Sequence, residues 1–252
     1  MKGLFGGQIL KKDMLIAVPS KGRAGLTSTD KILKESAVFF IPESEYHQYK
    51  GIIKNIECVP KDVQGITKTR NWILKNTNEK NVVMIDDDVV NCGYNFLDTR
   101  RTKKIQIKEE GFWIEEFLKY FDLCNQLGYK IWGTRTESSP RGTYPYKPIL
   151  TRTYVTASLM GIINDGEYLF DENFPVKEDY EICLRHIKDK GGILGIRYLH
   201  WENNHWVKDG GCKDYRTIEM EKSCIKKLIR LYPNMISKVQ RKANQFTIKL
   251  NI

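Results

Sequence analysis

The sequence has 252 residues, of which 41% are hydrophobic and 29% charged, a balance typical of an ordinary globular protein. No apolar run approaches the length of a membrane span and no signal-peptide core begins the chain, so we expect no membrane segment and a cytoplasmic location. The formal net charge of +10 indicates a polyanionic partner, most naturally a nucleic acid. The six cysteines form no C-x-x-C pair, which argues against a zinc knuckle or a redox pair.

Short apolar runs alternate with amphipathic stretches through the first half of the chain. They predict strands over 14–18, 37–41, 56–59 and 82–85, and helices over 28–34, 43–49 and 65–76. This alternation is typical of a mostly parallel sheet with helices on both faces. We therefore expect an α/β protein of three layers, preceded by a flexible arm over 1–12.

The second half contains the longest predicted helix, over 110–127, whose apolar residues recur at helical spacing and which ends at Gly128. The other predicted elements are a crossing strand or turn over 91–97, an exposed basic segment over 100–104, a strand over 129–132, a long loop over 134–153, sheet over 155–163, a helix over 178–190, a strand over 193–199 and a helix over 213–231. A basic C-terminal extension follows over 233–252. No repeat or shift in composition marks a second domain, so we predict one domain over 1–252.

Three consecutive carboxylates, Asp86, Asp87 and Asp88, follow the predicted strand over 82–85. A short β-branched run predicts a strand buried on both faces, and open α/β sheets bind ligands where such strands end. Adjacent carboxylates raise one another's pKa unless a cation holds them, and Mg²⁺ and Mn²⁺ prefer oxygen ligands. We interpret Asp86 and Asp88 as metal ligands, with Asp86 and Asp87 also beside a bound nucleotide diphosphate. The simpler alternative is an acidic turn that bonds its own backbone.

The turn after the first strand combines glycines with Pro19, Ser20, Lys21 and Arg23. Backbone N–H groups and cations in such a turn suit a nucleotide phosphate, so we predict that these four residues contact the nucleotide. The turn matches neither G-x-x-x-x-G-K-[ST] nor G-x-G-x-x-G, which argues against an ATPase-type loop and a dinucleotide fold. The alternative is a glycine-rich connector with solvated charges.

Charged residues on two predicted helices are further candidates. Arg70 precedes the acidic strand, and its forked guanidinium suits a phosphate or a site carboxylate better than Lys68 does. Glu178 and Asp179 begin a later helix, where a carboxylate fixed on a rigid element is a candidate base for an attacking hydroxyl. The alternatives are a solvated helix face for the cations and dipole stabilisation for the carboxylates.

His200 and His205 come just after the predicted strand over 193–199, and one imidazole is a candidate to complete the metal shell. The choice between them stays open, and a histidine alone is more often structural. His200 and Glu202 form an H-x-E, but no P-C-x-x-C follows, which argues against a zinc deaminase.

Four segments together resemble the TET/JBP-associated glycosyltransferase family, which has the GT-A fold and occurs mostly in bacteriophages. They are 16–23, the segment 65–72 with its Thr-Arg-Asn-Trp, the three aspartates at 86–88, and the Glu-Asp pair at 178–179. The Asp-x-Asp alone is a weak signal, whereas the set in this order, spanning most of the chain, is more specific.

The resemblance implies a metal-dependent enzyme that moves a sugar from a UDP-sugar to a hydroxymethylated pyrimidine in DNA. In that pattern Asp86 and Asp88 hold Mn²⁺ or Mg²⁺ on the donor, and Asp179, with Glu178 beside it, supplies the base of an inverting reaction. A late histidine often joins the metal. We expect a monomer, located in the host cytoplasm if a phage encodes it.

A DNA acceptor also fits the basic charge, because a base flipped out of a duplex stacks on aromatic side chains while cations hold the backbone. The loop over 134–153 interleaves both kinds of residue. The candidates for DNA contact there are Arg135, Arg141, Tyr144, Tyr146 and Lys147, and further candidate phosphate contacts are Arg100, Arg101, Lys103 and Lys104.

Three alternatives stay open for the chain as a whole. One is a GT-A glycosyltransferase with a protein or glycan acceptor. Another is a metal-dependent nuclease or nucleotidyltransferase, in which the aspartate cluster holds two ions. The third is a non-catalytic module that only binds nucleic acid.

Overall fold

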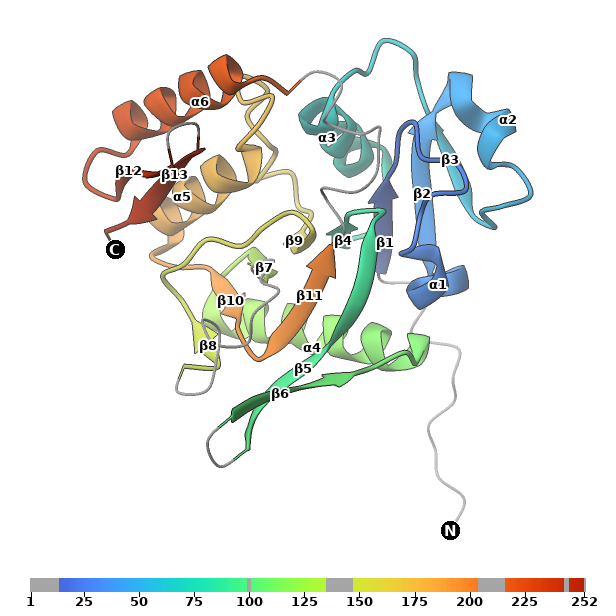
Figure 1. The fold of residues 1–252 in the computed structure, drawn as a ribbon, viewed down its shortest axis with the longest axis horizontal. Coiled ribbons are helices and arrows are strands. Elements are labelled where there is room, and N and C mark those ends of the chain that lie inside the picture. Colours follow the sequence, from blue (N-terminus) through green and yellow to red (C-terminus); the bar gives the residue numbers. More distant parts are fainter. Residues whose placement is uncertain (1–13, 99–100, 135–146, 204–215, 243–244, 252) are drawn as a thin grey trace.

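Figure 1 shows the computed structural model, which describes residues 14–98, 101–134, 147–203, 216–242 and 245–251. The flexible arm predicted over 1–12 lies outside these residues. Within the described ranges, no helix has the length and apolar character that crossing a membrane requires.

An eight-stranded sheet lies at the centre of the molecule, with strand order β3-β2-β1-β4-β9-β7-β10-β8 (Figure 1). Its strands are β1 Met14–Pro19, β2 Ala37–Pro42, β3 Ile56–Val59, β4 Asn81–Ile85, β7 Ile131–Gly133, β8 Ile149–Leu150, β9 Leu159–Ile163 and β10 Leu194–Ile196. The first four are parallel to one another, whereas β9 runs antiparallel to both of its neighbours, β4 and β7. The predicted α/β architecture with a mostly parallel sheet is confirmed.

Helices cover both faces of this sheet (Figure 1). They are α1 Asp30–Leu33, α2 Tyr46–Tyr49, α3 Ile66–Asn76, α4 Glu110–Leu127, α5 Glu178–Lys190 and α6 Ile218–Leu231, with the short 3-10 turns η1 Lys34–Ser36 and η2 Glu43–Glu45. One core cluster lies between the sheet and α4, and a second lies between the sheet and helices α3 and α5.

The burial of β4 explains why the run over 82–85 is apolar throughout. Val83 and Ile85 pack into the cluster with α4, whereas Val82 and Met84 pack into the cluster with α3 and α5. All four side chains are 0% exposed, and burying each one stabilises the fold by about 1.5–3 kcal/mol. The carboxylates that follow therefore leave the sheet from a strand that is fixed on both faces.

Two positions require glycine for different reasons, one a close approach in the core and the other a left-handed backbone conformation. Gly161 on β9 pairs with Trp132 on β7, and a Cβ at Gly161 would lie 2.1 Å from the indole ring. Gly128 follows α4 with φ of 72°, a left-handed conformation in which its N–H bonds back to the helix, as predicted for the end of this helix.

A second sheet, of three strands, corrects two predictions. It contains β11 Leu199–Asn203, β5 Val89–Asp98 and β6 Arg101–Gln106. The stretch predicted as one strand over 193–199 is split, because β10 ends at Ile196 in the central sheet and β11 begins at Leu199 in this one. The segment predicted as exposed over 100–104 is largely strand β6, and Lys104 in it is partly buried and ion-paired with Glu202.

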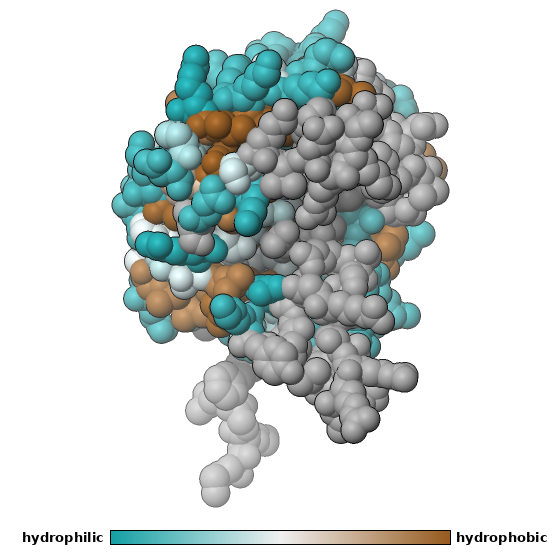
Figure 2. Space-filling view, turned by 60° about the vertical axis from the view of Figure 1, so that its left-hand side comes forward, coloured by the Kyte–Doolittle hydropathy of each residue, from teal (hydrophilic) through white to brown (hydrophobic). Residues whose placement is uncertain are grey.

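The basic extension predicted over 233–252 is a folded hairpin of β12 Ile236–Lys242 and β13 Gln245–Leu250. Its residues Ile236 and Ile248 are buried in a third cluster with Leu184 of α5 and Leu228 of α6. Figure 2 turns this side of the molecule forward, and brown hydrophobic residues appear there as separate patches among teal hydrophilic ones. The hairpin is therefore part of the packing around α5.

Candidate active site

The first turn and the acidic segment lie side by side because β1 and β4 are parallel neighbours in the sheet. Ser20 and Arg23 leave the end of β1, and both donate hydrogen bonds to the Asp87 carboxylate at 2.5 Å. The backbone N–H groups of Ser28 and Thr29 donate to the Asp87 carbonyl at 3.0 and 3.3 Å. Burial raises the pKa of Asp87, and the adjacent Arg23 opposes that shift. The Asp87 carboxylate thus ties the two segments together.

Asp86 and Asp88 share a partner that the sequence did not reveal. The Asn203 amide donates to Asp88 Oδ1 at 2.8 Å and approaches Asp86 Oδ2 at 3.5 Å. Arg23 donates to the other oxygen of Asp88 at 3.2 Å. Asn203 reaches this place because β11 runs antiparallel to β5 and ends opposite Val89, the residue after Asp88. Only the strand pairing identifies Asn203, since no motif marks it.

Arg70 brings the two acidic motifs into one site. Its Nη1 bonds Glu178 Oε1, and its Nη2 lies 3.3 Å from Asp86 Oδ1. The side chain of Arg70 is 5% exposed and that of Glu178 is 8% exposed. A single buried guanidinium therefore spans the carboxylates that end β4 and begin α5, which are 92 positions apart in the sequence.

Glu178 and Asp179 have different surroundings although they are adjacent. Glu178 is buried against Arg70, and burial raises its pKa to about 7 even though the guanidinium acts in the opposite direction. Asp179 is partly exposed, and one of its oxygens accepts the Tyr180 backbone N–H at 2.9 Å. Of the two carboxylates, Asp179 is the one open to a reacting molecule.

The remaining residues of the first turn lie at the surface. Pro19 ends β1 and is partly exposed, and Lys21 is exposed beside the buried Ser20. The side chains of Ser20 and Arg23 are already bonded to aspartates. The backbone N–H groups of Ser20, Gly22 and Arg23 are also engaged within the protein. The exposed side chain of Lys21 is thus the group of the turn best placed to meet a phosphate.

The structure does not bring His200 to the aspartates. His200 is 1% exposed on β11 and its ring lies against Gly93, where an added Cβ would be 2.9 Å from Cε1. Burial and the nearby Lys104 lower the pKa of His200 to about 4. His200 lies three residues before Asn203, about 10 Å along an extended strand. The metal role predicted for His200 is therefore not supported by its position.

Several predicted contacts lie outside the described residues. These are His205, Arg100, Arg135, Arg141, Tyr144 and Tyr146. Lys147 is described and is exposed.

The donor atoms at the site fit a hard cation. Among the described residues, no group of three or more histidine, cysteine or carboxylate side chains forms a metal cluster. Asp86 and Asp88 nevertheless offer carboxylate oxygens on one side of the site, and the amide oxygen of Asn203 is buried without a hydrogen-bond partner. An all-oxygen set of this kind suits Mg²⁺ or Mn²⁺.

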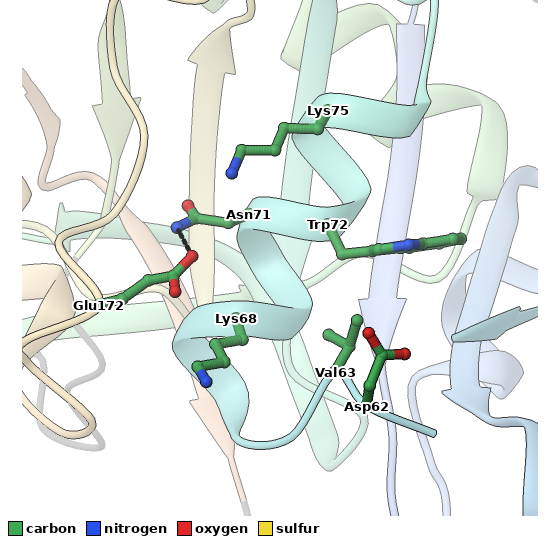
Figure 3. Close-up of a pocket in the computed structure, with 7 residues that line it drawn as sticks. All are labelled: Asp62, Val63, Lys68, Asn71, Trp72, Lys75 and Glu172. Atoms are coloured by element: carbon green, nitrogen blue, oxygen red, sulfur yellow. Dashed lines mark hydrogen bonds between the residues drawn. The ribbon is translucent and has the colours of Figure 1, made fainter. Parts of the chain in front are cut away.

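A surface pocket of about 260 Å³ lies against α3 (Figure 3). Its lining residues are Asp62, Val63, Lys68, Asn71, Trp72, Lys75 and Glu172, and the Asn71 amide donates to Glu172 at 3.0 Å. Asp86, Asp87, Asp88 and Glu178 do not line this pocket. The pocket is therefore distinct from the candidate active site.

Solved structures share the fold at low sequence identity. A crystal structure of glucosyl-3-phosphoglycerate synthase from Mycobacterium tuberculosis, in complex with Mn²⁺, UDP-glucose and glycerol 3-phosphate, matches with a TM-score of 0.54 and 8% identity, covering 94% of this chain and 87% of that one. Residues 1–349 of TarS from S. aureus match with a TM-score of 0.49 and 10% identity, covering 86% of this chain; this chain spans 65% of the TarS fragment.

Sequence comparison identifies the family. No curated protein matches the sequence. The family model for TET-associated glycosyltransferases matches residues 14–211, which include the first turn, Arg70, the aspartates, the Glu-Asp pair and Asn203. Because this match covers most of the chain, the protein belongs to the TET-associated glycosyltransferase family.

Proposed function

We propose that this protein transfers a sugar from a UDP-sugar to a hydroxymethylated pyrimidine in DNA, with Mn²⁺ or Mg²⁺ bound at the ends of β4 and β11. The observation that carries the proposal is the bridge made by Arg70, because it sets Asp86 of the first acidic motif and Glu178 of the second in one site. Membership of a glycosyltransferase family supports glycosyl transfer over the nuclease alternative.

The donor half of the site consists of Asp86, Asp88 and the amide of Asn203. A divalent ion held there supplies positive charge that stabilises the leaving diphosphate. The exposed Lys21 of the first turn is the side chain proposed to contact the phosphates. The synthase with the same fold that was crystallised with Mn²⁺ and UDP-glucose is consistent with this arrangement.

The acceptor half of the site is organised around Asp179. The acceptor hydroxyl oxygen attacks the anomeric carbon, the bond from that carbon to the diphosphate oxygen breaks, and UDP leaves. The hydroxyl proton passes to the Asp179 carboxylate, which is partly exposed and free of the buried Arg70 pair that holds Glu178. A base acting on the acceptor in this way favours inversion at the anomeric carbon.

The acceptor is proposed to be DNA because the chain carries a formal net charge of +10 and the family is named for its association with TET proteins. A polyanion is attracted to such a protein before any specific contact forms. The nearest rival is an enzyme of the same family with a protein or glycan acceptor.

The test is mass spectrometry of nucleosides after incubating hydroxymethylated DNA with the protein and a panel of sugar nucleotides. We expect a glycosylated nucleoside to form only when Mn²⁺ or Mg²⁺, a UDP-sugar and the modified DNA are all present. The Asp88→Asn variant is expected to abolish the product. Donor hydrolysis with no sugar transferred to DNA would refute the DNA acceptor, and cleavage or extension of plain DNA would favour the nuclease or nucleotidyltransferase alternative.

A further inference from the structure

The segment 151–158 between β8 and β9 packs along the first turns of α5. The Cys183 thiol of α5 donates to the Val155 carbonyl at 3.5 Å. Two residues later, the Ala157 carbonyl lies 3.5 Å from Nη2 of Arg70. Ala157 therefore lies beside the group that joins the two acidic motifs, and Val155 lies beside the helix that carries Asp179.

A pair of stacked tyrosines occupies the junction between this segment and α5. The rings of Tyr154 and Tyr180 are 4.5 Å apart between centroids with an interplanar angle of 28°. Both side chains are partly exposed, and Tyr180 directly follows Asp179 in the sequence. The Lys177 ammonium lies 5.1 Å from the centroid of Tyr180 and also pairs with Glu221 at 3.1 Å, which fixes the second ring of the pair.

This pair differs from the other aromatic contacts of the molecule. Among the described residues, every other ring pair is tilted or edge-on, and the cluster around Trp113 and Trp132 is fully buried in the core. Both residues of this stacked pair are instead partly exposed, next to Asp179 in the chain. Bases stack well on aromatic rings whatever their own identity, because every base has a π-face.

We propose that Tyr154, backed by Tyr180, is the platform on which the unstacked acceptor base rests while its hydroxymethyl group faces Asp179. The inference rests on the proposed function, since it assigns the acceptor subsite of that same site. A base leaving a duplex loses its stacking energy, and an aromatic ring beside the catalytic carboxylate restores part of it. Both tyrosines lie within the described residues, unlike most of the loop over 134–153 in which the sequence predicts DNA contacts.

The test compares Tyr154→Leu with Tyr154→Phe and Tyr154→Trp, using Tyr46→Leu on α2 as the matched control. Tyr46 is also partly exposed and also contacts a neighbouring ring, but it lies on a different helix. We expect Tyr154→Leu to raise the KM for modified DNA by about tenfold or more, as loss of one base–aromatic stack does. The KM for the UDP-sugar stays unchanged, and the Phe and Trp variants and the control behave like wild type.

A second readout does not depend on turnover or on any variant. DNA carrying 5-iodouracil at the target position is irradiated with the wild-type protein, and the crosslinked peptide is sequenced by mass spectrometry. We expect the crosslink at Tyr154 or Tyr180. A crosslink only elsewhere, or Tyr154→Leu with wild-type KM for DNA, would overturn the platform while transfer by the wild type still stands. Absence of transfer to any DNA by the wild type would instead refute the proposed function.

Discussion

Arg70 is the residue on which the geometry of the site depends most. Its guanidinium is buried with two carboxylates on it, and the Glu178 side chain is buried as well. Removing one member of a buried ion pair leaves the other charge uncompensated, which costs far more than an exposed pair contributes. We therefore expect replacement of Arg70 to lower the stability of the protein as well as its activity.

Replacing Arg70 with leucine is expected to lower the free energy of unfolding by about 3–5 kcal/mol at pH 8, because Glu178 is left buried without its cation. The loss should be smaller at pH 5, where Glu178 is protonated. Urea unfolding at both pH values measures the effect. Lys68→Met, on the exposed face of the same helix, is the control and should change stability by less than about 0.5 kcal/mol.

Glu178 is expected to make stability depend on pH. Burial raises its pKa to about 7 in the folded protein, above the value of about 4.3 in an unfolded chain. Its contribution is therefore fully present below about pH 4.3 and is lost as the pH rises to about 7, because the unfolded state releases this proton first. Glu178→Gln should reduce that decline in urea unfolding between pH 5 and 7.5. The exposed Glu172→Gln serves as the control, and an equal decline in all three proteins would contradict the assignment.

At the scale of elements, helices were predicted well where their ends carry a strong signal. Helix α4 ends at Leu127, just before Gly128, and α5 begins at Glu178, as the glycine and the acidic first turn indicated. Strand partners were not predictable in this way, because pairing depends on residues far apart in sequence. The position of Asn203 next to Asp88 follows only from the antiparallel pairing of β11 with β5, and the same pairing carries His200 away.

Gly111 in α4 and Gly128 just after it are expected to respond oppositely to alanine. Gly128 has φ of 72°, so Gly128→Ala should destabilise the protein by about 1 kcal/mol. Gly111 lies inside the helix with no atom within 4 Å of an added Cβ, so Gly111→Ala should stabilise it by about 0.5–1 kcal/mol. Thermal unfolding of both variants measures the difference. Changes of the same sign would contradict the assigned end of the helix.

At the scale of the whole molecule, the parallel half of the sheet was predictable because short strand-like runs alternate with helices from β1 to β4. The C-terminal hairpin was not, since its basic composition hides the two isoleucines, Ile236 and Ile248, that pack against α5 and α6. The charge of a segment indicates which partners its surface attracts. Whether the segment folds depends instead on its few buried apolar residues.

The net charge predicts that salt strongly weakens binding of the DNA acceptor but has little effect on binding of the UDP-sugar donor. Raising NaCl from about 50 to 200 mM should weaken DNA binding by more than about tenfold if at least two phosphates are neutralised. Binding of the UDP-sugar should change little over the same range, because a compact site with a bound ion is screened less than an open surface. Fluorescence anisotropy of labelled DNA and calorimetry of the sugar nucleotide give the two affinities. Equal salt dependence of both would contradict a polyanionic acceptor.

Both carboxylate oxygens of Asp88 already accept hydrogen bonds within the protein, one from Asn203 and the other from Arg23. An arriving ion competes with that arginine, and an arriving diphosphate offers the arginine another anion. Binding of either ligand thus increases the affinity of the protein for the other. Thermodynamic reciprocity requires that the two affinities increase by the same factor. Titrating UDP with and without Mn²⁺, and Mn²⁺ with and without UDP, should yield two equal ratios of Kd, both greater than one.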